Sequence, residues 1–191
     1  MKSGNSHIKL FNNLKTIFVF GLIVLFACNQ DNHTESILMR YTSKNNGEQK
    51  IYNYRLETIV YDKILTYNYS DKQDGIKYSL IFDNENNSIS IVENDIKSTT
   101  ILLGTKHINF NDRDINVSCY RVDNPDHLGE KQTIYFNKEY GLIISDFSSG
   151  LNEYIKTKEK SANIEKVLEM IKNDSDFMNL DIEYILKNLP N

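Results

Sequence analysis

The middle of the chain alternates hydrophobic and polar residues with a period of two, which is the pattern of half-buried β-strands. In KYSLIF (77–82) and SISIVE (88–93), apolar side chains occupy every second position. The stretch DNENN (83–87) between them consists of residues that favour turns. This segment therefore predicts a β-hairpin.

Two further hairpins are predicted in the same way. In HINFNDRDINVSCYRV (107–122) the turn is expected at 111–114, and in TIYFNKEYGLIISDF (133–147) at 137–141. Gly141 is expected to supply the positive φ that the second of these turns requires. Earlier strands are predicted at 37–43, 50–61 and 64–70.

The period changes near the carboxyl end. In SANIEKVLEMIKND the apolar residues recur at i, i+3, i+4 and i+7, namely at Ile164, Val167, Leu168 and Ile171. This spacing predicts an amphipathic helix over 161–173, and a second helix is predicted over 181–189, begun by Asp181 and ended by Pro190. Because strands come first and helices last, the predicted fold class is α+β, with an antiparallel sheet that buries the helix faces.

The amino-terminal region carries an apolar run from Ile17 to Ala27 that is 11 residues long. A helix that spans a bilayer needs about 20 apolar residues, so this run is too short to cross one. Lys2, Lys9 and Lys15 precede it without any acidic residue. A basic segment, a short apolar segment and a small final residue predict a signal peptide over 1–27.

The residues Leu25-Phe26-Ala27-Cys28 resemble the lipobox of bacterial lipoproteins. The resemblance implies that Cys28 carries diacylglycerol on its thiol, that cleavage precedes Cys28, and that the new amino terminus is acylated, for example with palmitate. Several acyl chains would give a durable anchor, whereas a single chain binds a membrane only marginally. Asn29, in place of an aspartate, favours the outer membrane over the inner membrane.

Residues 28–36 are interpreted as the lipidated cysteine and a flexible spacer, because 29–36 contain no apolar residue. Residues 37–191 are interpreted as a single β-rich domain. Removing residues 1–27, which hold three lysines and no acid, leaves 164 residues and changes the net charge from −4 to −7. An acidic chain without a cluster of basic residues excludes the electrostatic footprint of a nucleic-acid-binding protein.

Cys119 is the one cysteine left if Cys28 carries lipid, so no disulfide within the chain is expected. It alternates with Ile115 and Val117 on an apolar strand face. We therefore expect a buried, unreactive thiol, since a nucleophilic cysteine needs a partly exposed, electropositive environment.

The chain carries no recognisable catalytic or cofactor motif: H-E-x-x-H, G-x-S-x-G, the Walker loop and the Rossmann glycines are all missing. Asp123, Asp126, His127 and Glu130 crowd one loop, where hard oxygen ligands could hold calcium. They follow no known ligand register, so a solvated turn is the favoured interpretation. We expect no metal, no cofactor and no enzymatic activity, with a hydrolase using dispersed carboxylates as the less favoured alternative.

Tyrosines form the remaining signal: Tyr52 and Tyr54 share one strand face, and Tyr67 and Tyr69 share another. Aromatic pairs on neighbouring strands stabilise a sheet, and this is the favoured interpretation. The alternative is an exposed aromatic surface that binds a protein or a glycan.

CYRV followed by TIYFNKEYGLIISDF resembles the hairpin of small periplasmic β-rich lipoproteins, some of which are curved-sheet lipid carriers. The resemblance implies a curved sheet. Together these observations predict a non-enzymatic binding or structural domain of the bacterial cell envelope, tethered to a membrane through Cys28. The alternative is a carrier that holds an apolar ligand or lipid between the curved sheet and the helices.

Overall fold

The computed structural model describes residues 31–71, 75–110, 112–123, 132–156 and 161–187. Residues Asn32–Asn191 form one compact unit. The predicted signal peptide and Cys28 lie outside the described residues, as do most of the acidic loop around His127 and residues 188–189 of the second predicted helix.

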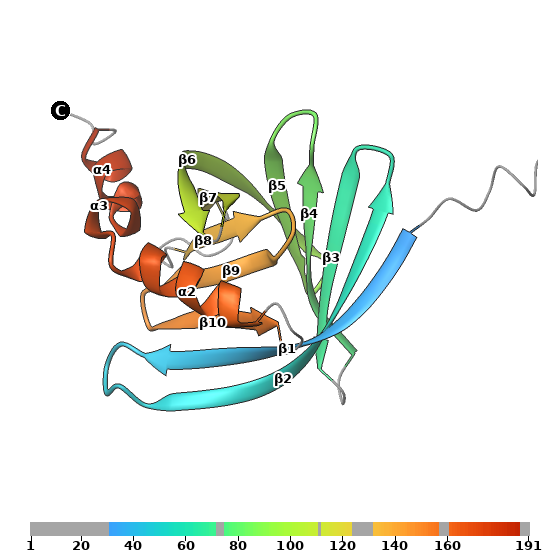
Figure 1. Ribbon diagram of the computed structural model, residues 1–191, viewed down its shortest axis with the longest axis horizontal. Coiled ribbons are helices and arrows are strands. Elements are labelled where there is room, and N and C mark those ends of the chain that lie inside the picture. Colours follow the sequence, from blue (N-terminus) through green and yellow to red (C-terminus); the bar gives the residue numbers. More distant parts are fainter. Residues whose placement is uncertain (1–30, 72–74, 111, 124–131, 157–160, 188–191) are drawn as a thin grey trace, which may run out of the picture. The chain divides into compact units, whose positions relative to one another are not determined.

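The described residues form a closed antiparallel β-barrel in which each strand pairs with its neighbours in sequence (Figure 1). The barrel closes because the first strand pairs with the last one, with Ile37 opposite Lys156 and Ser43 opposite Gly150. The strands are β1 (Asp31–Ser43), β2 (Gln49–Tyr61), β3 (Ile64–Asp71), β4 (Gly75–Asp83), β5 (Ser88–Glu93), β6 (Ile96–Phe110), β7 (Arg113–Asp123), β8 (Gln132–Asn137), β9 (Gly141–Phe147) and β10 (Gly150–Lys156).

The predicted α+β class, with a curved antiparallel sheet followed by helices, is therefore wrong, although the strands are antiparallel as predicted. The fold is mainly β, and its helices are short additions to the outside of the barrel. The order of strands and helices along the chain is the same in both architectures. What separates them is the pairing of β1 with β10, which no local pattern reveals.

The predicted hairpins are present. Phe82 lies opposite Ile89 across the β4–β5 turn, and Asn137 lies opposite Gly141 across the β8–β9 turn. Gly141 has a φ of +75°, as predicted, and a Cβ atom there would lie 2.7 Å from the hydroxyl of Tyr69. Both the backbone conformation and the space therefore require glycine.

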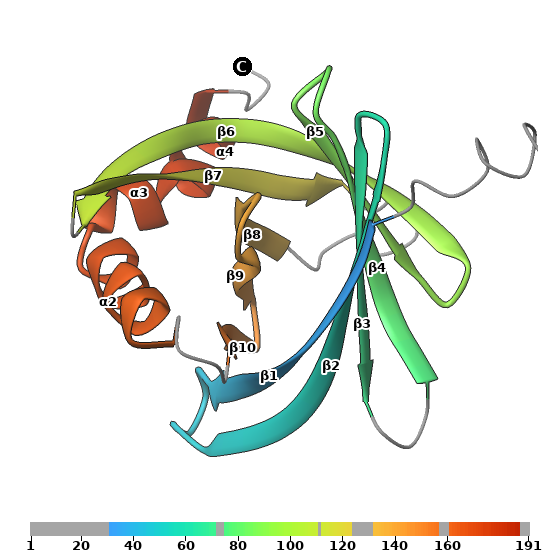
Figure 2. The same ribbon diagram turned by 45° about the vertical axis from the view of Figure 1, so that its right-hand side comes forward.

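Bulges in the β3–β4, β6–β7 and β8–β9 pairs help the sheet to curve. Leu102 pairs with Tyr120 and Gly104 with Cys119, which leaves Leu103 as an extra residue in β6. The register shift in the β8–β9 pair leaves Ile143 as the extra residue, and the one in the β3–β4 pair leaves Lys77. Bulges bend the strand that carries them and increase its twist, and β6 and β7 arch over the barrel in Figure 2.

Residues that are neighbours along a strand are buried in two different hydrophobic cores, one on each face of the sheet. The interior core fills the barrel and includes Tyr67, Tyr69, Leu80, Phe82 and Phe136. The outer core lies between the helices and the strands that they cover. It includes Cys119, Tyr135 and Ile144. β7 to β9 are consequently buried on both faces.

Three helices cover one side of the barrel: α2 (Ser161–Lys172), α3 (Ser175–Met178) and α4 (Leu180–Lys187) (Figure 2). The four apolar residues of the predicted α2 face are all buried in the outer core: Ile164, Val167, Leu168 and Ile171. Among the described residues, no helix is both long enough and apolar enough to span a membrane.

The predicted spacer requires a correction, because residues 31–36 belong to β1. Glu35 is only 9% exposed, and its Oε1 lies 2.5 Å from Nζ of Lys156. A polar segment can thus be part of the barrel when its charge is paired. The absence of apolar residues does not make it a free linker.

Candidate functional site

Aromatic side chains occupy the middle of the barrel. Tyr67 packs edge-on against Phe136 with ring centroids 5.5 Å apart, and Phe82 packs against the same ring at 5.1 Å. The hydroxyl of Tyr67 donates to the carbonyl of Lys138 at 2.6 Å, so its polar end is satisfied. Since the middle is filled, the cavities described next lie towards the two ends of the barrel.

One end holds a partly enclosed cavity of about 230 Å³, which we call the tyrosine cavity. Its apolar wall is formed mainly by the rings of Tyr54, Tyr78 and Tyr154 and by Leu80, Ile91 and Leu142. These residues come from β2, β4, β5, β9 and β10, which barrel closure brings together. The ring of Tyr78 stacks on Tyr69 at 4.7 Å and is therefore held in place.

The hydroxyl of Tyr78 and Oδ1 of Asn152 are buried behind this wall, and the hydroxyl of Tyr154 interacts with both side chains. Burial raises the pKa of Tyr78 well above its ordinary value, and the neighbouring Tyr154 adds to this effect. Tyr78 is therefore a neutral hydroxyl at physiological pH.

Charged groups at this cavity are few. Lys77 and Glu93 belong to its lining, and Nζ of Lys77 lies 3.2 Å from the carboxylate of Asp71. The amide of Gln132, which also lines the cavity, donates to the hydroxyl of Ser145 at 2.9 Å. With one cation and one anion in the lining, the cavity does not select for a charged ligand.

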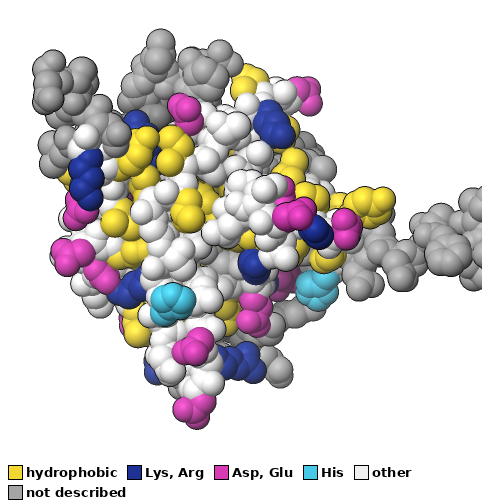
Figure 3. All heavy atoms as spheres, turned by 90° about the horizontal axis from the view of Figure 1, so that it is seen from above, with side chains coloured by type: hydrophobic (Ala, Val, Ile, Leu, Met, Phe, Trp, Pro, Cys, Tyr) yellow, Lys and Arg dark blue, Asp and Glu magenta, His cyan; other side chains and the backbone are white. Residues whose placement is uncertain are grey.

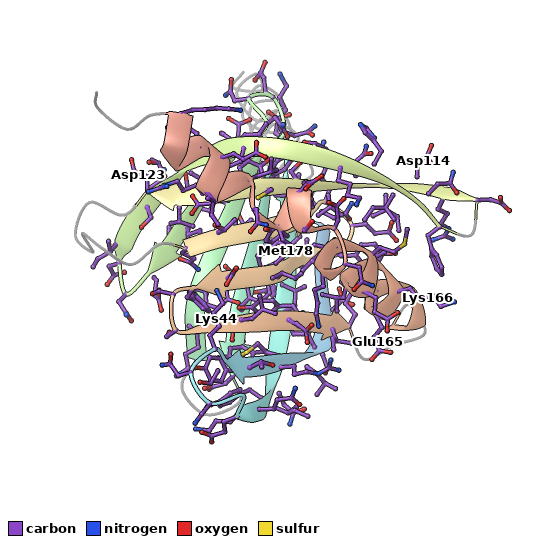
Figure 4. All side chains as sticks on the ribbon, turned by 90° about the vertical axis from the view of Figure 1, so that its left-hand side faces the viewer. Lys44, Asp114, Asp123, Glu165, Lys166 and Met178 are labelled. Carbon is purple, nitrogen blue, oxygen red and sulfur yellow. The ribbon has the colours of Figure 1, made fainter. Side chains whose placement is uncertain are left out.

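The other end of the barrel holds a more polar hollow of about 360 Å³, which we call the polar cup. Asp114 belongs to its lining, and Figure 4 shows Asp114 and Asp123 at opposite ends of β7. The cup's polar groups largely satisfy one another. Asn137 donates to the carbonyl of Asn116 at 2.8 Å, and the hydroxyl of Tyr120 donates to the carbonyl of Asn87 at 3.3 Å.

A third hollow, of about 220 Å³, lies between the barrel wall and α2, next to Glu165, which is labelled in Figure 4. The buried carboxylate of Glu153 accepts hydrogen bonds there from Arg40 at 3.1 Å and from Lys172 at 2.6 Å. This charged network ties α2 to β1 and β10. It is not the apolar space that a carrier between sheet and helices would need.

The four tyrosines singled out from the sequence do not form one exposed surface. Tyr67 and Tyr69 are 1% and 0% exposed inside the barrel. Tyr54 is half-buried in the wall of the tyrosine cavity, and Tyr52 is 43% exposed. Sequence analysis missed Tyr78, Asn152 and Tyr154, because their proximity depends on barrel closure.

Side chains that could bind a metal ion are dispersed over the described residues. No three His, Cys, Asp or Glu side chains lie close enough together there to hold a metal ion. A hydrogen bond from Asn86 lowers the pKa of Asp83, and one from Lys106 lowers the pKa of Asp174. The two carboxylates lie apart, at the end of β4 and at the N-cap of α3. Cys119 is buried and free, as predicted.

The molecular surface shows no single dominant feature on the face in Figure 3. Hydrophobic side chains on that face are interspersed with charged side chains of both signs. Scattered apolar residues of this kind are normal on a protein surface and need no partner.

No protein-family model and no curated protein matches the chain. Among solved structures, it is similar to a crystal structure described as an outer membrane lipoprotein-sorting protein domain from Vibrio parahaemolyticus, with 14% identity and a TM-score of 0.21. The match covers 60% of this chain and 65% of that chain, which is less than two thirds of the Vibrio domain. At this TM-score, neither the fold nor the role of that domain carries over.

Proposed function

We propose that the protein is a non-enzymatic binding domain of the bacterial cell envelope, and that it binds a small molecule in the tyrosine cavity. The observation that carries this proposal is a partly enclosed cavity of about 230 Å³ at one end of the barrel, lined by tyrosine rings and aliphatic side chains with a few polar groups. Binding sites are typically concave and largely apolar, with a few polar groups that orient the ligand.

The location in this proposal comes from the amino-terminal sequence. The lipobox-like residues Leu25 to Cys28 would place a lipid anchor immediately before the barrel, with the outer membrane favoured. Since β1 begins at Asp31, only a few residues would separate the anchor from the folded domain. The barrel would then stand close to the membrane surface.

The size of the cavity supports a small ligand over a lipid. A volume of about 230 Å³ lies below the 300–1,000 Å³ that is usual for pockets of drug-sized ligands. The packed rings of Tyr67, Phe82 and Phe136 leave little room for an acyl chain to pass through the barrel. A binding role for a small molecule is therefore better supported than lipid carriage.

The test is to purify the full chain from cell membranes in mild detergent, denature it, and identify the released small molecules by mass spectrometry. We expect one compound in stoichiometric amount. Ile91→Trp, which projects a large ring from the cavity wall, should lose that compound while keeping the unfolding temperature close to that of the wild type.

The matched control is Val60→Trp, which places the same side chain at an exposed position of β2. It should retain the compound. Equal amounts of compound in all three proteins would contradict binding in the tyrosine cavity, and a stoichiometric phospholipid would support the carrier instead. Palmitate labelling of the wild type but not of Cys28→Ala would test the anchor separately.

A further inference from the structure

Building on the lipid anchor at Cys28 in the proposed function, we infer that one end of the barrel lies against the lipid surface. This end carries the β2–β3 turn, and Val60 and Tyr61, which precede that turn, would contact the headgroup region of the bilayer. Two features support this contact: the point where the chain enters the barrel, and the side chains that are exposed beside that point.

The entry point of the chain fixes which end is near the anchor. Asp31, where β1 begins, is the third residue after Cys28, so an extended connection between them spans about 10 Å at most. β1 and β2 each have 13 residues and are joined by a tight turn in which the N–H of Ser43 donates to the carbonyl of Glu48 at 2.9 Å. The start of β1 therefore lies beside the end of β2, as Figure 1 shows.

The end of β2 exposes apolar surface at this place. Tyr61 is 72% exposed, the largest value for any large hydrophobic side chain in the described part of the chain, and the adjacent Val60 is 37% exposed. Tyr61 pairs with Ile64 across a two-residue turn in which Asp62 has a φ of +53°, so its ring lies at the tip of the hairpin. Tyrosine is favoured at membrane–water interfaces, because its ring is apolar and its hydroxyl remains hydrated.

The charges at this end indicate which lipids it would contact. The N–H of Asn84 donates to the carbonyl of Lys63 at 2.9 Å, so the β2–β3 and β4–β5 turns form one surface. Nζ of Lys63 lies 2.8 Å from the carboxylate of Glu85, which pairs the positive charge of this lysine. These two turns therefore lack the cluster of free basic residues that anionic lipids attract. We expect contact with zwitterionic lipids, and little dependence on salt.

This orientation has a consequence for the proposed ligand site. Tyr54, near the start of β2, lines the tyrosine cavity, and Tyr52 precedes Tyr61 by nine residues, about 30 Å along an extended strand. With Tyr61 at the bilayer, the tyrosine cavity lies at the end of the barrel that faces the aqueous phase. A ligand would then reach the cavity from water and not from the membrane.

The experiment uses the fact that the chain contains no tryptophan, so one introduced tryptophan reports its own surroundings. Lipidated protein carrying Tyr61→Trp is purified from membranes and reconstituted into phosphatidylcholine vesicles brominated near the headgroups. Bromine quenches tryptophan only at short range. The matched control is Tyr52→Trp, a 43% exposed position at the other end of the same strand. Circular dichroism checks that both variants fold.

We expect Tyr61→Trp to lose most of its emission in brominated vesicles relative to unbrominated ones, and Tyr52→Trp to keep its emission. The quenching should be the same at low and high salt. Equal quenching of both variants would mean that the barrel lies on its side, and stronger quenching of Tyr52→Trp would mean that the opposite end faces the bilayer. Either result, or the absence of quenching in both variants, would overturn the inference.

A protein that begins at Asn29 and carries Tyr61→Trp separates the contact from the anchor. It should lose the quenching, because two side chains alone hold a bilayer only weakly. Quenching that persists in this protein would show that the surface binds lipid unaided and would support the inference. Palmitate labelling reports the anchor at Cys28 separately, and the analysis of released compounds reports ligand binding, so failure of either part of the proposed function is distinguished from failure of the lipid contact.

Discussion

Tyr69 shows how single residues decide the interior of this barrel. Its ring is fully buried and stacks on Tyr78, and its hydroxyl reaches the backbone of β9. The alternation of Tyr67 and Tyr69 correctly predicted a strand with both rings on one face. It could not tell the inside from the outside, because tyrosine suits a packed core as well as a wet interface when its hydroxyl finds a partner.

Cys119 provides a prediction at this scale. Burial raises the pKa of its thiol to about 12, so almost no thiolate forms at neutral pH. In a protein carrying Cys28→Ser, we expect a thiol reagent to label Cys119 very slowly in buffer and rapidly in denaturant. Fast labelling of the folded protein would show that the outer core opens around β7.

Gly141 and Gly47 lie in two turns and allow the cost of backbone strain to be measured separately from the cost of a steric clash. Both have positive φ values, +75° and +70°, but a Cβ at Gly141 would meet Tyr69 and Tyr67, whereas none of the described atoms lies within 4 Å at Gly47. We expect Gly47→Ala to cost about 1 kcal/mol from the backbone alone. Gly141→Ala should cost clearly more, by urea unfolding. Equal losses would mean that Tyr69 moves aside freely.

At the scale of elements, local patterns identified most strands and the α2 face, because hairpin turns and amphipathic spacing are properties of short segments. β5 and β9 begin close to where the sequence places them. The start of β1 was missed, since its polar residues become part of the barrel only by pairing with distant ones. Glu35 has its partner, Lys156, at the far end of β10. Asn152 and Tyr154 were missed in the predicted site for the same reason, because they meet the other cavity residues only through pairing between strands that are distant in sequence.

The start of β1 can be tested by shortening the chain. A protein that begins at Ile37 loses residues 31–36 of the strand together with Glu35 and leaves the buried Lys156 without that carboxylate. We expect its unfolding temperature to fall by several degrees relative to a protein that begins at Asn29, since about 1 kcal/mol corresponds to 2–4 °C at this size. A protein that begins at Asp31 serves as the control and should match the longer one. A free linker would give the same value for all three.

For the whole molecule, the buried tyrosines and Cys119 make the free energy of unfolding decrease at alkaline pH. Burial raises the pKa values of Tyr69 and Tyr78 well above 10 and that of Cys119 to about 12. An unfolded chain releases these protons from about pH 8.5–10 upward, while the folded chain retains them. The unfolded state then binds fewer protons, so the free energy of unfolding falls as pH rises.

We therefore expect stability to be insensitive to these groups below about pH 8 and to decline progressively above pH 9. Urea unfolding at pH 7, 9 and 10.5 measures the decline, and Tyr78→Phe should make it shallower. Absorbance from the phenolates of the buried tyrosines should appear together with the loss of the β-sheet signal. Full phenolate absorbance in a protein that is still folded would contradict the burial of these rings.

The seam between β1 and β10 has a consequence for the biogenesis of the protein. Arg40 and Glu153 face each other across it although they are 113 residues apart in the sequence. Ribosomes release the amino end first, so β1 must wait with an open edge until nearly the whole chain has been synthesised. Any product that stops before β10 would expose two unpaired strand edges, and such edges recruit other chains into aggregates. The last strand thus acts as a check on the length of the chain, since only a chain that extends through β10 can shield the edge that its first strand exposes.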